Sequence, residues 1–146
     1  LLSVPTPYSA SPDQRVEASR PLIELNLIVG RALSRDMVDE IQRLCDRAED
    51  AGANAIVRID LDARPIDSDA ADTAAGALSV TLVNQWERAL RRLERLAAVT
   101  VVVATADIGG LGLAVLLCAD YRIVADTVHL RLSHPGQPML PGMVLH

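Results

Sequence analysis

The chain has 146 residues and a formal net charge of −5 at pH 7, and half of its residues are hydrophobic. This length suits one domain, and an acidic balance without a dense basic stripe argues against a nucleic-acid partner. No apolar run reaches the length of a membrane span and no signal peptide is visible, so we expect a soluble cytoplasmic protein without a membrane partner. The absence of lysine excludes Schiff-base catalysis.

Residues 1–20 contain three prolines and several serines without a hydrophobic period, which predicts an extended or disordered arm. We expect the core domain over residues 21–146, beginning with a strand over residues 22–29. Ser34 is a suitable N-cap for a helix that runs to about residue 50 and ends at Gly52. Its apolar stripe has helical spacing and contains Val38, Ile41, Leu44, Cys45 and Ala48.

The second half of the chain alternates strands and helices. A strand is predicted over residues 55–61, then an acidic loop, and then a helix over residues 78–97. The β-branched run over residues 99–103 is typical of a strand buried on both faces. A glycine-rich turn precedes a helix over residues 113–119, which must be buried because it has no polar face. Strands over residues 121–125 and 128–132 follow, and this alternation predicts an α/β fold.

Cys45 and Cys118 are the only cysteines, and both lie in apolar helical patterns. Buried free thiols are therefore the favoured interpretation. A disulfide or a metal-binding pair is the alternative, although no second pair of cysteines or histidines stands at ligand spacing. We expect no metal site.

The turn that contains Gly109, Gly110 and Gly112 is a candidate binding element. Glycine lets a ligand approach the backbone closely, and the first N–H groups of a helix have no intrahelical acceptor. An oxyanion or a phosphate would be stabilised there. The turn forms neither a P-loop nor a complete Rossmann fingerprint. Alternatively, the glycines only allow the helix to pack tightly on the strand.

The run from Thr100 to Asp126, TVVVATADIGGLGLAVLLCADYRIVAD, resembles the signature of the crotonase (enoyl-CoA hydratase/isomerase) superfamily. Leu25-Asn26, Ala32-Leu33-Ser34 and Pro141-Gly142 extend the resemblance over about residues 22–146. The resemblance implies a crotonase-like core, a ββα superhelix, truncated on its C-terminal side. Full crotonases continue into further core elements and a helical segment that builds trimers, so a homo- or hetero-oligomer of trimer type is implied.

The resemblance also implies that the substrate is an acyl-CoA thioester and that no separate cofactor is needed. Two backbone N–H groups would hold the thioester oxygen. The first is that of Ala71, because Ala70-Ala71-Asp72 matches the family's G-A-D. The second is that of Leu111, because Gly110-Leu111-Gly112 matches the family's G-G-G.

Active hydratases of this superfamily use two carboxylates, and neither has a counterpart in this chain. The first position falls on Ala114 and the second lies near His134. His134 is the only nearby titratable group of suitable pKa, and a surface-loop histidine is the alternative interpretation. A carboxylate could also come from Asp69, Asp72 or Asp107, although solvated loop acids or caps are the favoured interpretation of each. Whether the chain is an enzyme therefore stays open.

Within the superfamily, residues 84–96, 120–123 and 141–143 are similar to the short auxiliary crotonase of 3,5-dihydroxyphenylglycine biosynthesis. This similarity implies a dehydratase/hydratase-like enzyme that acts on a CoA-bound polyketide and helps a type III polyketide synthase deliver dihydroxyphenylacetyl-CoA. One alternative is a non-catalytic pseudo-crotonase that assists the synthase or a second crotonase. Another is an α/β binding module with no link to acyl-CoA.

Overall fold

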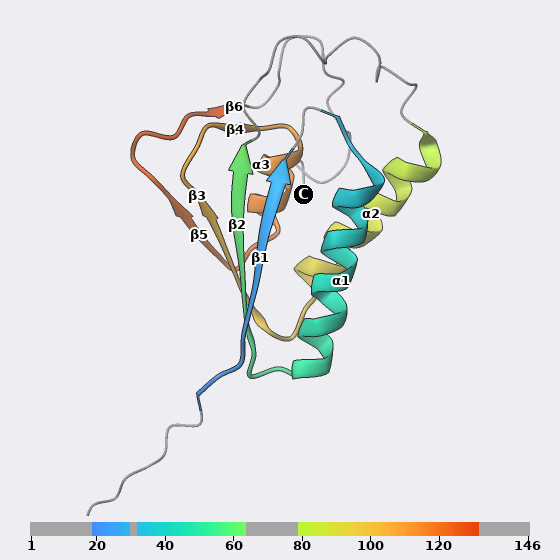
Figure 1. The fold of residues 1–146 in the computed structure, drawn as a ribbon, viewed down its shortest axis with the longest axis vertical. Helices are drawn as coiled ribbons and strands as arrows, with labels where there is room; N and C mark the ends of the chain where they lie inside the picture. Colours follow the sequence, from blue (N-terminus) through green and yellow to red (C-terminus); the bar gives the residue numbers. More distant parts are fainter. Residues whose placement is uncertain (1–18, 30–31, 64–78, 132–146) are drawn as a thin grey trace, which may run out of the picture.

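A computed structural model of the chain describes residues 19–29, 32–63 and 79–131 (Figure 1). The elements in chain order are β1 (Leu22–Val29), α1 (Arg35–Ala51), β2 (Ile56–Ala63), α2 (Val80–Glu94), β3 (Val99–Ala104), β4 (Ile108–Gly109), α3 (Leu111–Leu117), β5 (Tyr121–Val124) and β6 (Leu130–Arg131). The predicted α/β class is confirmed. Most of the predicted N-terminal arm lies outside the described residues, and no helix within them is long and apolar enough to cross a membrane.

The strands form a four-stranded sheet in the order β1-β2-β3-β5 and a separate pair of β4 with β6. Every pairing is parallel. Each later strand of the large sheet therefore joins the edge that the previous one left open. The register places Leu25, Ile59, Val102 and Arg122 side by side across the four strands.

Helix α1 is capped at both ends, by Ser34 and by Gly52. The Ser34 side chain accepts a hydrogen bond from the Met37 N–H at 3.2 Å, which confirms the predicted N-cap. Gly52 ends the helix at a φ of 84°, and its N–H bonds to the Ala48 carbonyl. The predicted stripe is buried from Val38 to Ala48, and it packs on β1 and on α2.

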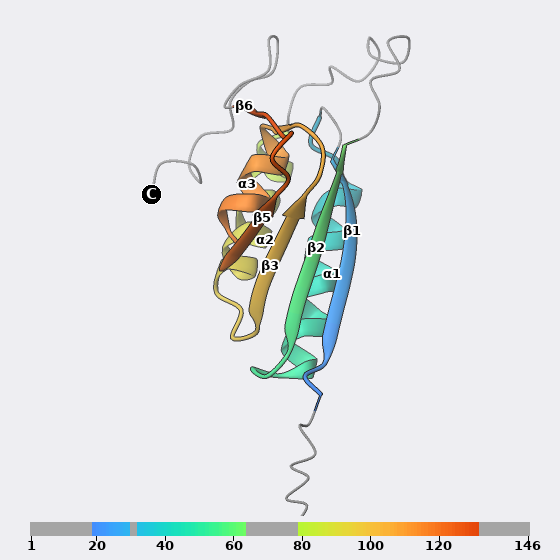
Figure 2. The ribbon, with the colours of Figure 1, turned by 90° about the vertical axis from the view of Figure 1, so that its left-hand side faces the viewer.

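The three helices lie on one face of the large sheet (Figures 1 and 2). On β3 this face carries the buried side chains of Thr100, Val102 and Ala104, whereas Val101 and Val103 on the other face are half-buried. The prediction that this strand is buried on both faces is therefore wrong. Its β-branched residues fit the pleated surface of a strand, but the described elements cover only one of its faces.

The glycine-rich region differs from the prediction in two details. Helix α3 begins at Leu111, two residues earlier than predicted, because the positive φ of Gly110 ends the preceding turn. The short strand β4 was not predicted, since two residues are too few to create a period. Helix α3 is buried from Leu111 to Leu116, as its apolar sequence predicts.

Candidate active site

The carboxyl ends of the parallel strands lie together at one end of the large sheet. The register pairs Val29 with Ala63 and Leu61 with Ala104, so β1, β2 and β3 end close together. Residues 30–31, residues 64–78 and the glycine-rich turn all follow these strand ends. In open parallel α/β sheets, ligands bind at the carboxyl ends of the strands, so the candidate site is expected at this end of the sheet.

Gly110 shapes the turn at the start of α3. Its φ of 50° and ψ of −111° form a backbone conformation that a side chain would strain. The Gly110 carbonyl accepts the N–H of Ala114 at 3.1 Å, which closes the first turn of the helix. As the first helical residue, Leu111 has an N–H without an intrahelical acceptor. The Leu111 side chain is buried in the core, so only its backbone belongs to the turn.

Gly112 differs from Gly110, although both were predicted to line the site. A Cβ added at Gly112 would meet the Cβ of Ile108 at 3.5 Å and Cγ1 of Val29 at 3.6 Å, which are ordinary van der Waals distances. The structure therefore requires glycine at position 110 and tolerates a small side chain at position 112.

Asp107 and His129 lie close to the turn, and each is the residue that immediately precedes a short strand, β4 and β6 respectively. Asp107 Oδ1 accepts the backbone N–H of His129 at 2.8 Å and lies 3.3 Å from its Nδ1. The Ile108 N–H donates to the His129 carbonyl at 3.2 Å. These bonds tie the two short strands together, which agrees with the structural interpretation of Asp107. The His129 side chain, which the sequence interpretation missed, is 78% exposed.

No sequence-family profile matches the chain. An "Enoyl-CoA-hydratase" of Amycolatopsis orientalis is 41% identical over 122 residues, which are 84% of this chain and 54% of that protein. A putative enoyl-CoA hydratase/isomerase from Mycobacterium abscessus superposes with a TM-score of 0.59 at 19% identity, over 79% of this chain and 48% of the other. An enoyl-CoA hydratase/isomerase family protein from Pseudomonas syringae superposes with a TM-score of 0.57 at 24% identity, over 75% of this chain and 50% of the other.

The chain has the crotonase fold. The chain spans about half the length of the relatives that it matches.

Asp120 and Arg122, which carry part of the resemblance to the crotonase signature, have structural roles here. Asp120 Oδ2 accepts the Thr100 N–H at 2.8 Å and the Thr100 hydroxyl at 2.9 Å, and the Asp120 N–H donates to that hydroxyl at 3.1 Å. Arg122 donates to the carbonyls of Leu116 and Leu117, both at 2.9 Å. Arg122 therefore binds carbonyls of the last turn of α3, where the Leu116 carbonyl also accepts the Ala119 N–H at 3.3 Å.

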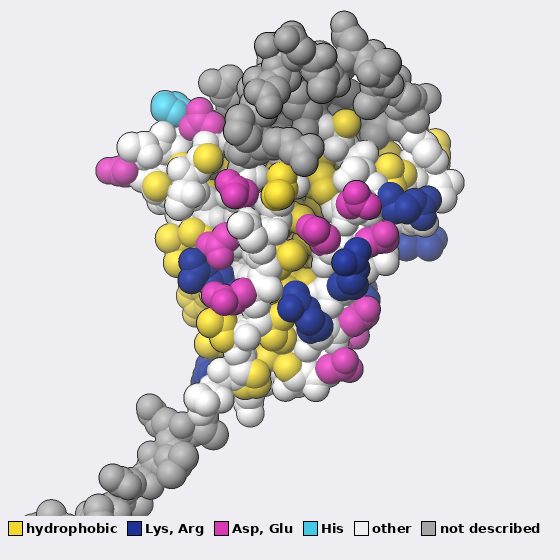
Figure 3. Space-filling view, in the orientation of Figure 1, with side chains coloured by type: hydrophobic (Ala, Val, Ile, Leu, Met, Phe, Trp, Pro, Cys, Tyr) yellow, Lys and Arg dark blue, Asp and Glu magenta, His cyan; other side chains and the backbone are white. Residues whose placement is uncertain are grey.

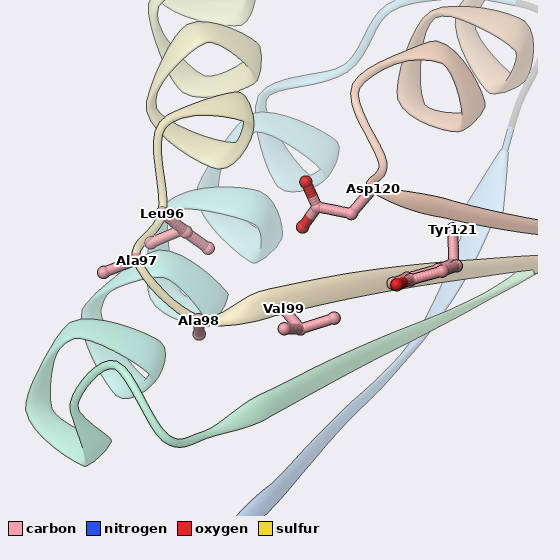
Figure 4. Close-up of a pocket in the computed structure, with 6 residues that line it drawn as sticks. All are labelled: Leu96, Ala97, Ala98, Val99, Asp120 and Tyr121. Atoms are coloured by element: carbon pink, nitrogen blue, oxygen red, sulfur yellow. The ribbon is translucent and has the colours of Figure 1, made fainter.

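A shallow hollow of about 490 Å³ lies beside these residues (Figure 4). Leu96 to Val99 line one side, and Asp120 and Tyr121 line the other. The hollow lies at the amino ends of β3 and β5, whereas the glycine-rich turn follows the carboxyl end of β3. It is therefore not the candidate active site.

Ala114, which the resemblance matches to the first family carboxylate, is buried in α3. None of the side chains of α3 can transfer a proton, because the helix contains only leucine, glycine, alanine and valine. Ala70, Ala71 and Asp72, together with Asp69 and His134, lie outside the described residues, and their roles stay predictions. Within residues 19–29, 32–63 and 79–131, no cluster of acidic, cysteine or histidine side chains could hold a metal ion.

Proposed function

We propose that the chain binds an acyl-CoA thioester at the carboxyl ends of its parallel strands. The observation that carries this proposal is the turn at Gly110, which presents the N–H of Leu111 without an intrahelical acceptor in a crotonase fold. The second N–H donor would be Ala71, in the loop that follows β2. Two donors directed at the thioester oxygen stabilise the negative charge that develops there when the α-proton is lost.

The reaction that we propose is the dehydration of a CoA-bound polyketide. In this reaction the α C–H bond and the β C–O bond break, and water leaves as the double bond forms. Formation of an aromatic ring makes the elimination favourable, so the demand on a protein acid or base is smaller than in the hydration of a simple enoyl-CoA. This requirement fits a site in which alanine replaces the first carboxylate, and His134 remains the candidate proton-transfer group.

The polyketide assignment rests on similarity to the auxiliary crotonase of 3,5-dihydroxyphenylglycine biosynthesis. The 41% identity to an Amycolatopsis protein called an enoyl-CoA hydratase supports the thioester class of substrate. The partner would be a type III polyketide synthase that supplies the CoA-bound chain, and the product would be dihydroxyphenylacetyl-CoA.

A second candidate function is that of a pseudo-crotonase, which assists the synthase or another crotonase without catalysis. The buried Ala114 favours it, because α3 offers the substrate no titratable side chain. The two candidates differ in their dependence on the turn. Catalysis requires the Leu111 N–H, whereas assistance through a surface does not.

The test is a reconstitution with the synthase and malonyl-CoA, in which dihydroxyphenylacetyl-CoA is measured by chromatography. We expect the wild-type chain to increase its formation and Leu111→Pro, which removes the N–H, to lower that increase by about 100-fold. Leu111→Ala shortens the side chain but keeps the N–H, so it serves as the control. If Leu111→Pro stimulates as well as Leu111→Ala, the chain acts without the oxyanion site and the pseudo-crotonase function holds.

A further inference from the structure

One face of α2 carries a row of four arginines, at helical spacing. They line a hollow of about 400 Å³ together with Glu49 of α1, and we call them the arginine row: Arg88, Arg91, Arg92 and Arg95. They are four of the 14 basic residues of a chain whose formal net charge is −5. The row is therefore a local concentration of positive charge on an acidic protein.

The acidic residues of α2 do not neutralise this row. Glu87 and Glu94 each precede an arginine of the row by one position, which turns them about 100° away around the helix. Within residues 19–29, 32–63 and 79–131, the exposed Arg88, Arg91 and Arg95 form no ion pair. Like charges three and four positions apart on a helix repel one another, so an anionic ligand would relieve this repulsion.

Arg92 shows which kind of anion fits the row. Its guanidinium binds two carboxylates of α1, Asp46 at 2.7 Å and Glu49 at 2.6 and 2.8 Å. These two acids are three positions apart and so share one side of a helix that packs beside α2 (Figure 1). An arginine of the row is thus bound by carboxylates spaced one turn apart on a neighbouring helix.

The exposed surface of α1 differs from the arginine row. Acidic and basic side chains are interspersed over α1, on the right-hand side of Figure 3. Such a surface offers no run of a single sign to a charged ligand. Among the helices of the described part of the chain, α2 alone presents successive arginines on one face.

We propose that an acidic helical segment of a partner protein docks along the arginine row. Its carboxylates, spaced one turn apart, pair with Arg88, Arg91 and Arg95 as those of α1 pair with Arg92. The row rises about 10 Å along α2, which matches two turns of a partner helix. A single phosphate would require guanidinium groups that converge on one point, whereas these follow one another along the axis. A nucleic acid would be repelled by the negative net charge of the chain.

Titration of the full chain with two labelled, alanine-rich helical peptides of identical composition tests this proposal. In the first peptide the glutamates lie on one face at one-turn spacing, and in the second they are distributed around the helix. We expect the first to bind with a dissociation constant at least about fivefold lower. The triple variant Arg88→Gln/Arg91→Gln/Arg95→Gln should raise that constant by more than about tenfold. Arg92 is kept, because it joins α2 to α1.

The matched control is Arg20→Gln/Arg35→Gln/Arg43→Gln. It removes the same charge from three exposed arginines outside the row, so it should leave the dissociation constant within about twofold of wild type. Circular dichroism establishes that each variant is folded, as expected, because glutamine and arginine have similar helix propensities.

Four results would overturn the proposal. The first is that neither peptide binds, and the second is that the two peptides bind equally, which would indicate attraction by net charge alone. The third is that the row variant binds as tightly as the control variant. The fourth is that inorganic tripolyphosphate binds more tightly than the first peptide, which would assign the row to a phosphorylated ligand. Because the assay contains no acyl-CoA, its outcome is independent of the proposed thioester site.

Discussion

Thr100 and Asp120 form a closed hydrogen-bonded unit between the starts of β3 and β5. The Thr100 hydroxyl both donates to the Asp120 carboxylate and accepts the Asp120 N–H, while the carboxylate also accepts the Thr100 N–H. Thr100 is the one buried polar side chain among the described residues of the core. Asp120 thus aligns the starts of the two strands.

Removing this unit should destabilise the fold. We expect Asp120→Ala to lower the free energy of unfolding by about 2–3 kcal/mol, because it leaves two donors of Thr100 unsatisfied. Thr100→Val keeps the shape and loses only the hydroxyl, so about 1–2 kcal/mol is expected. Urea denaturation measures both. An Asp120→Ala variant as stable as wild type would show that water replaces these bonds at no cost.

The two glycines at the start of α3, Gly110 and Gly112, should respond differently to alanine. Gly110→Ala forces a side chain onto a positive φ and should cost about 1–2 kcal/mol. Gly112→Ala places a methyl group at ordinary contact distances within a helix, where alanine is favoured over glycine by up to about 1 kcal/mol. Thermal unfolding should therefore show a lower Tm for Gly110→Ala and an equal or higher Tm for Gly112→Ala. Equal losses for both would contradict the turn geometry.

Arg92 should link α1 and α2 in a pH-dependent manner. Its guanidinium bonds to Glu49 at 2.6 and 2.8 Å and to Asp46 at 2.7 Å. The hydrogen bond from Arg92 lowers the pKa of Glu49 below its ordinary 4.5. A lowered pKa stabilises the fold above pH 4.5, and this contribution is lost as the pH falls through the folded-state value.

We therefore expect Arg92→Gln to lower Tm at pH 7, and the difference from wild type to shrink below pH 4.5. Arg91→Gln is the control, since Arg91 is exposed and the described residues give it no ion pair. It should leave Tm nearly unchanged at both pH values. A difference between Arg92→Gln and wild type that persists at low pH would indicate lost packing in place of a lost charge pair.

Cys45 and Cys118 should be unreactive in the folded protein. They are buried free thiols, and burial raises the pKa of each from 9.0 to about 11. At neutral pH the thiolate fraction is then about 100-fold smaller than that of an ordinary thiol. A disulfide-exchange reagent should label both thiols only after unfolding, and rapid labelling of the native chain would contradict their burial.

The same raised pKa values predict alkaline destabilisation. A thiol whose folded-state pKa is raised favours folding below its unfolded value, and this contribution is lost as the pH rises through the folded value. The free energy of unfolding should therefore fall between pH 9 and pH 11.

The sequence predicted those elements whose limits are set by neighbouring residues. Helix α1 was located because Ser34 and Gly52 cap it and its apolar stripe is continuous. Strand β4 and the Asp107–His129 contact were missed, because they arise from pairing with β6, over 20 residues away. The incomplete burial of Val101 and Val103 was missed for a related reason, since a β-branched run does not reveal which layers cover it.

The candidate site was predictable only in part. Leu111 was identified by its position in the glycine triplet, and the structure places it at the first position of α3. The sequence could not reveal that its side chain enters the core while Gly110 alone needs a positive φ, because both depend on how α3 packs. Ala71 and His134 remain predictions from resemblance.

The central claim is that the Leu111 N–H holds the oxygen of an acyl-CoA thioester. Calorimetric titration with an unreactive acyl-CoA analogue that keeps the carbonyl group tests it directly. We expect wild type and Leu111→Ala to bind with dissociation constants within about threefold of each other, and Leu111→Pro to bind at least about tenfold more weakly, since it loses one hydrogen bond to the carbonyl. Proline is tolerated at the first position of a helix, so a folded Leu111→Pro variant is expected. Equal binding by a folded Leu111→Pro variant, or no binding by the wild-type chain, would contradict the claim.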